Sequence, residues 1–398
     1  MATANSLPGA APASDRSDGR LLVLLASLPQ EQLASVLNKL AANIAPEDLL
    51  IATSDEAAKT TRPDLQIVTA DTTKSSWTIT AADFASAAQL AREHSAAAVL
   101  LLGPECDSLS QSSLRDLAAA AIAPAIDLAV PRYELPPRAG PVNSAILYPL
   151  SRALFASPVR FPLAVDLGMT LRTTEWLAVA AERLLKLNQA AAFLWPVSEA
   201  ANAGFTIREV EVGPRAVPQP AEPDLNAILP LITGSLFADV EAKAAFWQRP
   251  RSVPQDRVRR LAPQMPTADG ATDVAPMLQA FRLAYSNLQE LWSLVLPPAS
   301  LLGLKRLSLT EGAAFRMPDS LWARIVYDFL LAYRLRTINR GHLLGALIPL
   351  YLAWVASHIN ITTADSDPEQ HVESVAAAFV TEKPYLVARW RWPDRFNP

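Results

Sequence analysis

The first half of the chain alternates short apolar runs with stretches whose leucines and alanines recur at helical spacing. The apolar runs have the length of buried strands and cover residues 21–26, 49–52, 66–69, 96–102 and 127–130. Helical spacing predicts helices over 30–44, 81–93 and 110–121, with Thr80 as a candidate cap of the second. Strands that alternate with helices are typical of a parallel sheet covered by helices. We therefore predict an α/β fold for this half.

The second half carries only helical patterns. Amphipathic spacing predicts helices over 228–247, 277–296, 319–336, 342–359 and 368–381, with a polar loop over 249–272. Prolines cluster after Gly213, as is typical of a domain boundary. The chain has 398 residues, which suggests about two domains. We predict a disordered tail over 1–20, an α/β domain over 21–220 and an all-α domain over 221–398.

Composition excludes several classes of function. With 35 Lys and Arg against 39 Asp and Glu, the net charge of −4 provides no general attraction to nucleic acid or anionic lipid. The single cysteine, Cys106, excludes an internal disulfide and a cysteine-based zinc site. The chain has 13 glycines, none in a glycine-rich turn after the first predicted strand, which argues against dinucleotide binding and Walker-type phosphoryl transfer.

The chain also lacks the usual signals for export or membrane insertion. Residues 1–20 show no basic start followed by an apolar core, as a secretory signal would. The most apolar later stretch, 343–357, is shorter than the roughly 20 residues of a membrane span and is expected to be a buried core helix. We expect a cytoplasmic protein without a transmembrane segment.

Two carboxylates follow the most apolar predicted strand. Residues 96–102 end in Gly103 and Pro104, and Glu105 and Asp107 come next. Ligands of open α/β sheets bind at the carboxyl ends of the strands, so this pair is placed to hold a divalent metal or a ribose. The alternative is that both acids are loop residues ahead of the helix at 110–121. Cys106 has no nearby histidine base and is expected to be a small buried side chain.

The stretch after the fifth strand resembles bacterial GT-A glycosyltransferases of the mannosylglycerate and glucosylglycerate synthase kind. The residues that carry the resemblance are Asn143, Tyr148, Pro149, Leu150, Arg152, Ala153, Leu154, Val159, Arg160, Pro162, Asp166 and Gly168. Further similar segments are Glu199 with Gly204 and Phe205, then Gly213, Pro214 and Arg215, and finally residues 315–333. The resemblance implies a GT-A-like, Rossmann-related domain followed by a helical domain.

The resemblance also implies a reaction. A sugar would pass from a nucleotide-diphosphate sugar to a small or lipid-like hydroxyl acceptor, with Mg²⁺ or Mn²⁺ held by Glu105 and Asp107. Asp166 would be the catalytic residue that positions the acceptor hydroxyl. Asn143, Arg152 and Arg160 would bind the substrates.

Each of these residues also has a purely structural interpretation. Asp166 could cap a turn before Gly168, and Asn143 could cap the helix that follows it. Arg152 and Arg160 could form salt bridges on a solvated helix face. The residue types alone leave both interpretations open.

Departures from the family pattern favour a second hypothesis. Ala164 and Val165 stand where the family has two glycines, and their side chains would crowd a pocket there. The family's histidine ligand falls at Val217, and no histidine lies between His94 and His342. The alternative is therefore a catalytically inactive glycosyltransferase-like scaffold or binding protein. The donor, the acceptor and a homo-oligomeric state are all left open by the sequence.

Overall fold

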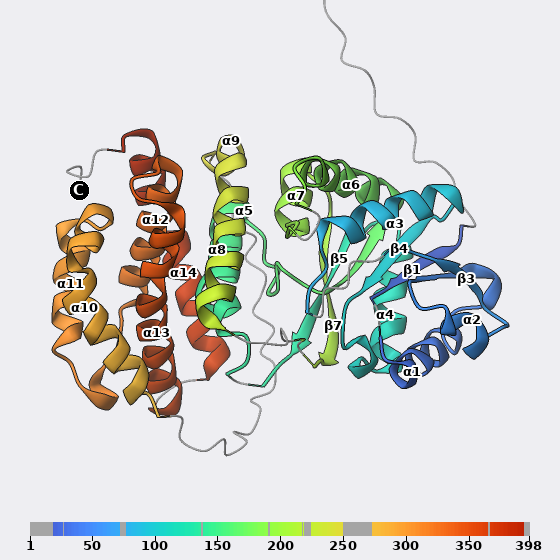
Figure 1. Cartoon of the computed structure of the whole chain (residues 1–398), viewed down its shortest axis with the longest axis horizontal. Helices are drawn as coiled ribbons and strands as arrows, with labels where there is room; N and C mark the ends of the chain where they lie inside the picture. The colour runs from blue at the N-terminus through green and yellow to red at the C-terminus, as the bar shows by residue number, and fades with distance from the viewer. Residues whose placement is uncertain are drawn as a thin grey trace, which may run out of the picture.

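The computed structural model describes residues 19–26, 28–71, 77–136, 138–189, 192–216, 218, 224–249, 273–364 and 367–393. A sheet covered by helices forms one half of the molecule and a bundle of helices forms the other (Figure 1). Residues 1–18 of the predicted tail and all of the predicted polar loop at 249–272 except residue 249 lie outside the described residues.

The sheet has seven strands in the order β3-β2-β1-β4-β6-β5-β7. They are β1 (Leu21–Leu25), β2 (Leu49–Thr53), β3 (Gln66–Thr69), β4 (Ala98–Leu102), β5 (Leu128–Glu134), β6 (Asp166–Thr170) and β7 (Ile207–Pro214). All neighbours pair in parallel except β6, which runs antiparallel to both β4 and β5. The mostly parallel sheet predicted from the alternating pattern is confirmed.

Helices cover both faces of this sheet. They are α1 (Gln30–Ala41), α2 (Ala57–Thr61), α3 (Ala81–Glu93), α4 (Gln111–Ile122), α6 (Leu171–Lys186) and α7 (Pro196–Ala203). Helices α3 and α6 pack together on one face, and α1 and α4 lie on the other (Figure 1). Thr80 and Asp83 form a capping box at the start of α3, so the predicted cap is confirmed.

Strand β5 is longer than the sequence predicts. The apolar run predicts a strand that ends at Val130, but the strand continues through Pro131 to Glu134. Pairing with β6 stops at Ala129, whereas pairing with β7 continues to the end. The missing N–H of Pro131 is tolerated because one edge of β5 is already unpaired there.

The second half forms the predicted helical bundle. It contains α8 (Leu225–Ala242), α9 (Ala244–Trp247), α10 (Ala275–Val295), α11 (Pro298–Ser308), α12 (Asp319–Leu335), α13 (Arg340–Ala364) and α14 (Pro368–Arg391). Its core holds the large buried side chains Trp247, Trp292, Trp322 and Trp354. Trp390, near the end of α14, packs against Trp247 with ring centroids 4.9 Å apart. The end of α14 therefore packs back on the bundle.

One helix from the first half belongs to the core of the second. A π-helical turn at Asn143–Leu147 leads into α5 (Tyr148–Phe155), and both share one hydrophobic cluster with the bundle. The indole N–H of Trp322 donates to the backbone oxygen of Ala145 at 2.8 Å. Helix α5 also packs against α14 (Figure 1). The two halves are therefore joined through α5 as well as through the chain after β7.

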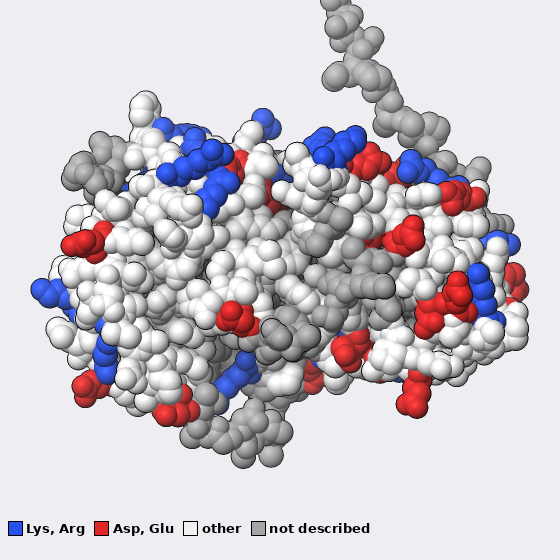
Figure 2. Space-filling view, in the orientation of Figure 1, with Lys and Arg blue, Asp and Glu red and all other residues white. Residues whose placement is uncertain are grey.

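Within the described residues, two helices are long and apolar enough to cross a membrane, judged by length and composition alone. They are α8, over Leu225–Ala242, and the part of α13 at Arg340–Thr363. In the α13 window 67% of the residues are buried inside the protein, which agrees with the expected core helix. On the face shown in Figure 2, basic and acidic side chains are scattered among uncharged residues.

Candidate functional site

The structure brings Asp166 to the acidic loop after β4. Asp166 begins β6 and pairs in register with Leu102, the last residue of β4. The Gly103 N–H donates to Oδ1 of Asp166 at 3.1 Å. A side chain at Gly103 would place its Cβ 2.4 Å from the backbone oxygen of Val165, so the two loops approach more closely than any residue but glycine permits.

Asp166 is the centre of a buried ion pair with Arg215, which follows β7. Arg215 Nε lies 2.9 Å from Oδ2 of Asp166, and Nη2 lies 3.2 Å from Oδ1. Both side chains are 0% exposed. The Tyr133 hydroxyl, from β5, donates to Oδ2 at 2.9 Å. Both carboxylate oxygens of Asp166 therefore already accept at least two hydrogen bonds each.

The remaining N–H groups of Arg215 are used by the acidic loop itself. Nη2 donates to the backbone oxygen of Pro104 at 2.7 Å, and Nη1 donates to the backbone oxygen of Glu105. Nη1 also lies 3.1 Å from Ser108 Oγ and 2.8 Å from the backbone oxygen of Ala216. Arg215 thus lies between Asp166 and the loop, and each of its three guanidinium nitrogens donates at least one hydrogen bond.

The charges of this cluster and its burial shift the pKa values of the side chains in and around it. Burial by itself would lower the pKa of Arg215, but the Asp166 carboxylate outweighs it, so the pKa is raised and the guanidinium stays charged. Burial, followed by the negative charge of Asp166, raises the pKa of Tyr133 well above its usual value. Burial also raises the pKa of the Cys106 thiol, which agrees with the inert buried cysteine that the sequence indicated.

The two acids of the loop have different surroundings. Glu105 is exposed and has a left-handed backbone with φ of 61°, and its carboxylate makes no hydrogen bond within the described residues. Oδ1 of Asp107 is buried without a hydrogen-bond partner. Lys39 Nζ comes close to Asp107 but donates to its backbone oxygen, at 2.6 Å.

A divalent metal does not fit the residues present here. Such an ion needs several oxygen ligands that converge on one point, whereas Asp166 is occupied by Arg215 and Glu105 is turned to solvent. No group of three His, Cys, Asp or Glu side chains that could hold a metal occurs among the residues the structure describes. Val217, where the resemblance places a histidine ligand, lies outside them.

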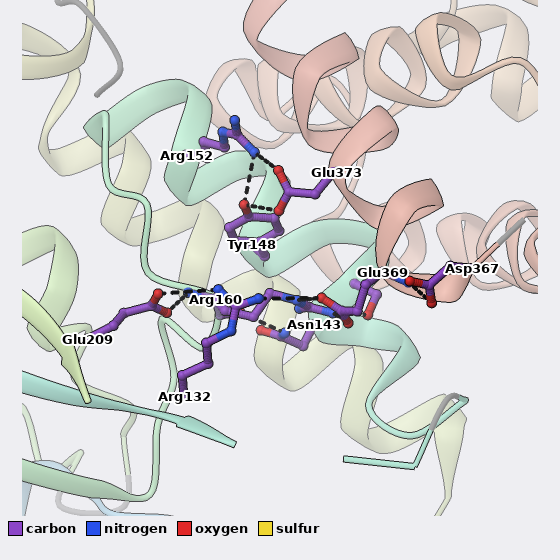
Figure 3. Close-up of polar contacts among 10 residues, drawn as sticks. Arg132, Asn143, Tyr148, Arg152, Arg160, Glu209, Asp367, Glu369 and Glu373 are labelled. Carbon is purple, nitrogen blue, oxygen red and sulfur yellow. Dashed lines mark hydrogen bonds and ion pairs between the residues drawn. The ribbon is translucent and has the colours of Figure 1, made fainter. Parts of the chain in front are cut away.

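The three predicted substrate-binding residues lie elsewhere, between α5 and α14 (Figure 3). Asn143 Nδ2 donates to the backbone oxygen of Arg160 at 2.9 Å and so ties the start of the π-helical turn to the loop before β6. Arg160 holds both oxygens of Glu369 in α14, at 3.2 and 3.0 Å. Glu209 of β7 accepts the backbone N–H of Arg160 at 2.5 Å.

Arg152 forms a parallel contact one helical turn away. Its guanidinium pairs with Glu373 and lies 2.9 Å from the Tyr148 hydroxyl, which itself donates to Glu373 at 2.6 Å. Glu369 and Glu373 are four residues apart and therefore share one face of α14. Arg152 thus joins α14 to α5, and Arg160 joins α14 to the loop before β6. Neither forms a hydrogen bond or ion pair with Asp166 or Arg215 in the part of the chain that the structure describes.

Sequence reasoning missed the partners of these residues. Arg215 was noticed only as part of a Gly-Pro-Arg segment, while Tyr133, Glu369 and Glu373 were not singled out. The chain separations are 49 residues for Asp166 with Arg215 and 221 for Arg152 with Glu373. No local pattern can signal a contact over such separations.

Comparison with known proteins finds fold-level similarity only. No protein-family model matches the chain, and no curated protein matches its sequence. One similar solved structure is glucosyl-3-phosphoglycerate synthase from Mycobacterium tuberculosis, in complex with Mn²⁺, UDP-glucose and phosphoglyceric acid. Its TM-score is 0.37 and its sequence identity 13%, and the match covers 59% of this chain and 82% of that one. The CMP:2-keto-3-deoxy-manno-octonic acid synthetase complexed with CTP has a TM-score of 0.32 and 14% identity, over 49% and 91%. These low scores assign neither a family nor a reaction to the chain.

Proposed function

We propose that this chain is a glycosyltransferase-like scaffold that acts by binding and does not transfer sugar. The observation that carries the proposal is the buried Asp166–Arg215 ion pair, in which the residue expected to position the acceptor is bound to an arginine. Of the other residues expected to react, Glu105 is exposed, and Arg152 and Arg160 pair with glutamates of α14.

The geometry of Asp166 disfavours a role as catalytic base. A general base must come within about 3 Å of the hydroxyl whose proton it takes. Asp166 is 0% exposed, and both its oxygens already accept hydrogen bonds from Gly103, Tyr133 and Arg215. An acceptor hydroxyl would have to displace one of these donors inside a closed cluster.

Arg215 is equally ill placed to replace the metal as a diphosphate clamp. A guanidinium that binds diphosphate needs free N–H groups in fork geometry. In Arg215 these groups are directed to Asp166, Ser108 and backbone oxygens of the loop. The cation therefore stabilises the loop and leaves no donor for a substrate.

The rival function is the metal-dependent transfer that the sequence resemblance implies. It would require a nucleotide-diphosphate sugar to bind, and Glu105 and Asp107 would hold a Mg²⁺ or Mn²⁺ ion that stabilises the charge of the leaving diphosphate. The two hypotheses differ in turnover and in the effect of metal on ligand binding.

The deciding experiment incubates the purified full chain with UDP-, GDP- and ADP-sugars, with and without Mn²⁺. Nucleotide release measures turnover, and the melting temperature measures binding. A ligand at about a hundred times its dissociation constant adds about 2.7 kcal/mol of stability, which a melting curve resolves. We expect no turnover and no Mn²⁺-dependent shift. Turnover by the unmodified chain that is lost in Asp107→Ala would overturn the proposal and support the transferase hypothesis instead.

A further inference from the structure

We propose that the arginines around Glu369 form a binding site for a small phosphate-like oxyanion, and that the Glu369 carboxylate occupies this site in its absence. The site lies between the sheet half and α14 and does not depend on whether the chain transfers sugar. It is centred on Arg160, with Arg132 from β5 beside it (Figure 3).

Arg160 is buried and incompletely bonded. Its side chain is 5% exposed and lies between the rings of Tyr148 and Phe161, each 5.1 Å away. The fork of Nε and Nη2 holds Glu369. The other fork has only the Ser144 hydroxyl, 3.0 Å from Nη2, and its Nη1 is buried without a partner. Such an unmet buried donor costs about 1–3 kcal/mol, which a suitable ligand would recover.

A second arginine lies beside the Arg160–Glu369 ion pair. Arg132 lies 4.0 Å from Glu369 and 3.6 Å from Glu209. Arg138 comes from the loop after β5 and contacts Thr363 at 3.0 Å. Arg160 and Arg132 therefore both lie beside Glu369. Burial, followed by His371, Arg160 and Arg138, lowers the pKa of His358 to about 4.

Glu369 has the properties of a replaceable occupant. Its side chain is 44% exposed, although its partner Arg160 is almost completely buried. It belongs to the first turn of α14, directly after Asp367 and Pro368, where a helix is least constrained. A carboxylate on the fork of Nε and Nη2 leaves Nη1 of Arg160 without a partner. A tetrahedral oxyanion is matched by either guanidinium fork.

The experiment is a calorimetric titration of the full chain with inorganic phosphate, and Glu369→Gln is the decisive variant. Removing the internal carboxylate should tighten phosphate binding about tenfold or more, the effect of one charge-assisted hydrogen bond. Arg160→Lys should abolish binding, because a lysine cannot offer two forks. Sulfate should compete with phosphate, whereas acetate should not.

Glu373→Gln is the matched control. Like Glu369, Glu373 lies on this face of α14 and pairs with an arginine. Its partner is Arg152 and not Arg160. Phosphate affinity should stay at the level of the unmodified chain. Hydrogen exchange in the first turn of α14 should rise when phosphate is added, since Glu369 is then released.

Equal behaviour of Glu369→Gln and Glu373→Gln would overturn the proposal and leave Glu369 as a structural ion pair. Binding that survives Arg160→Lys would place the anion elsewhere and overturn it as well. If Glu369→Gln fails to fold, the unmodified chain is compared with Arg160→Lys instead. No binding of phosphate to the unmodified chain, at any accessible concentration, would also contradict the site.

Discussion

Asp166 and Arg215 are 49 residues apart in the chain, yet their side chains meet at 2.9 Å in a pocket that excludes solvent completely. Desolvation of two charges is expensive, so such a pair is retained only when its hydrogen bonds are complete. Here they are complete on both sides. The pair links the start of β6, the loop after β4 and the segment after β7, and so it stabilises the end of the sheet where ligands of α/β proteins bind.

Breaking this ion pair should strongly destabilise the fold. Asp166→Asn leaves Arg215 as an uncompensated buried charge, which lowers the free energy of unfolding by about 3–5 kcal/mol. Adding Arg215→Met should recover much of the loss, because no charge then remains buried. Urea denaturation measures both effects. Arg115→Gln, in a surface pair whose side chains are 60% and 48% exposed, should cost less than about 1 kcal/mol. Equal losses from the two pairs would contradict the central role given to Asp166.

Gly103 should tolerate no side chain. In Gly103→Ala the new Cβ meets the backbone oxygen of Val165 at 2.4 Å, so one of the two loops must move and the protein loses about 1–3 kcal/mol. Gly345→Ala provides the contrast, because nothing lies within 4 Å of its Cβ position in α13. That change should stabilise the helix by up to about 1 kcal/mol. Thermal melts of the two variants should shift in opposite directions.

Acid should weaken the bundle through His358. Its Nδ1 lies 2.6 Å from Nδ1 of His371, so one ring donates and the other accepts, which requires at least one neutral ring. Burial, His371 and Arg160 lower the pKa of His358 to about 4, whereas the unfolded chain takes up this proton near its ordinary 6.5. Stability from this group is therefore present above about pH 6.5 and lost as the pH falls toward 4, by up to about 3 kcal/mol.

His358→Asn should flatten this part of the pH profile of the unfolding free energy. The matched variant is His342→Asn, since His342 is exposed at the start of α13. It should leave the slope between pH 6.5 and 4 unchanged. A slope that persists in His358→Asn would assign the titration to other groups.

Asp107 should be dispensable for folding. Its Oδ1 is buried without a hydrogen-bond partner, so Asp107→Ala removes an unsatisfied acceptor and should be neutral or up to about 1 kcal/mol stabilising. Asp55→Ala is the control, because Oδ1 of Asp55 accepts the Ala57 N–H at 2.9 Å before α2. Loss of that bond should cost about 1 kcal/mol. A large loss in Asp107→Ala would reveal a partner for this carboxylate.

The sequence by itself determined the elements whose signals are local. Apolar runs and helical spacing placed β1 to β4 and α1, α3 and α4 nearly where they lie, and Thr80 marked the start of α3. These features depend on residues within a few positions of one another, because strand burial and helix capping are short-range effects. The helical character of the second half followed for the same reason.

The tertiary structure alone decided β6, β7 and the chemistry of the candidate site. Strand β6 contains only five residues, among them Asp166 and Gly168, which are poor strand formers, and it is held in place by β4 and β5 on either side. Whether Asp166 faces a substrate or an arginine depends on where the segment after β7 returns to the sheet. The same holds for Arg160, whose partner Glu369 lies 209 residues away. A charge in a sequence can be recognised, but its counter-charge is chosen by packing between distant segments.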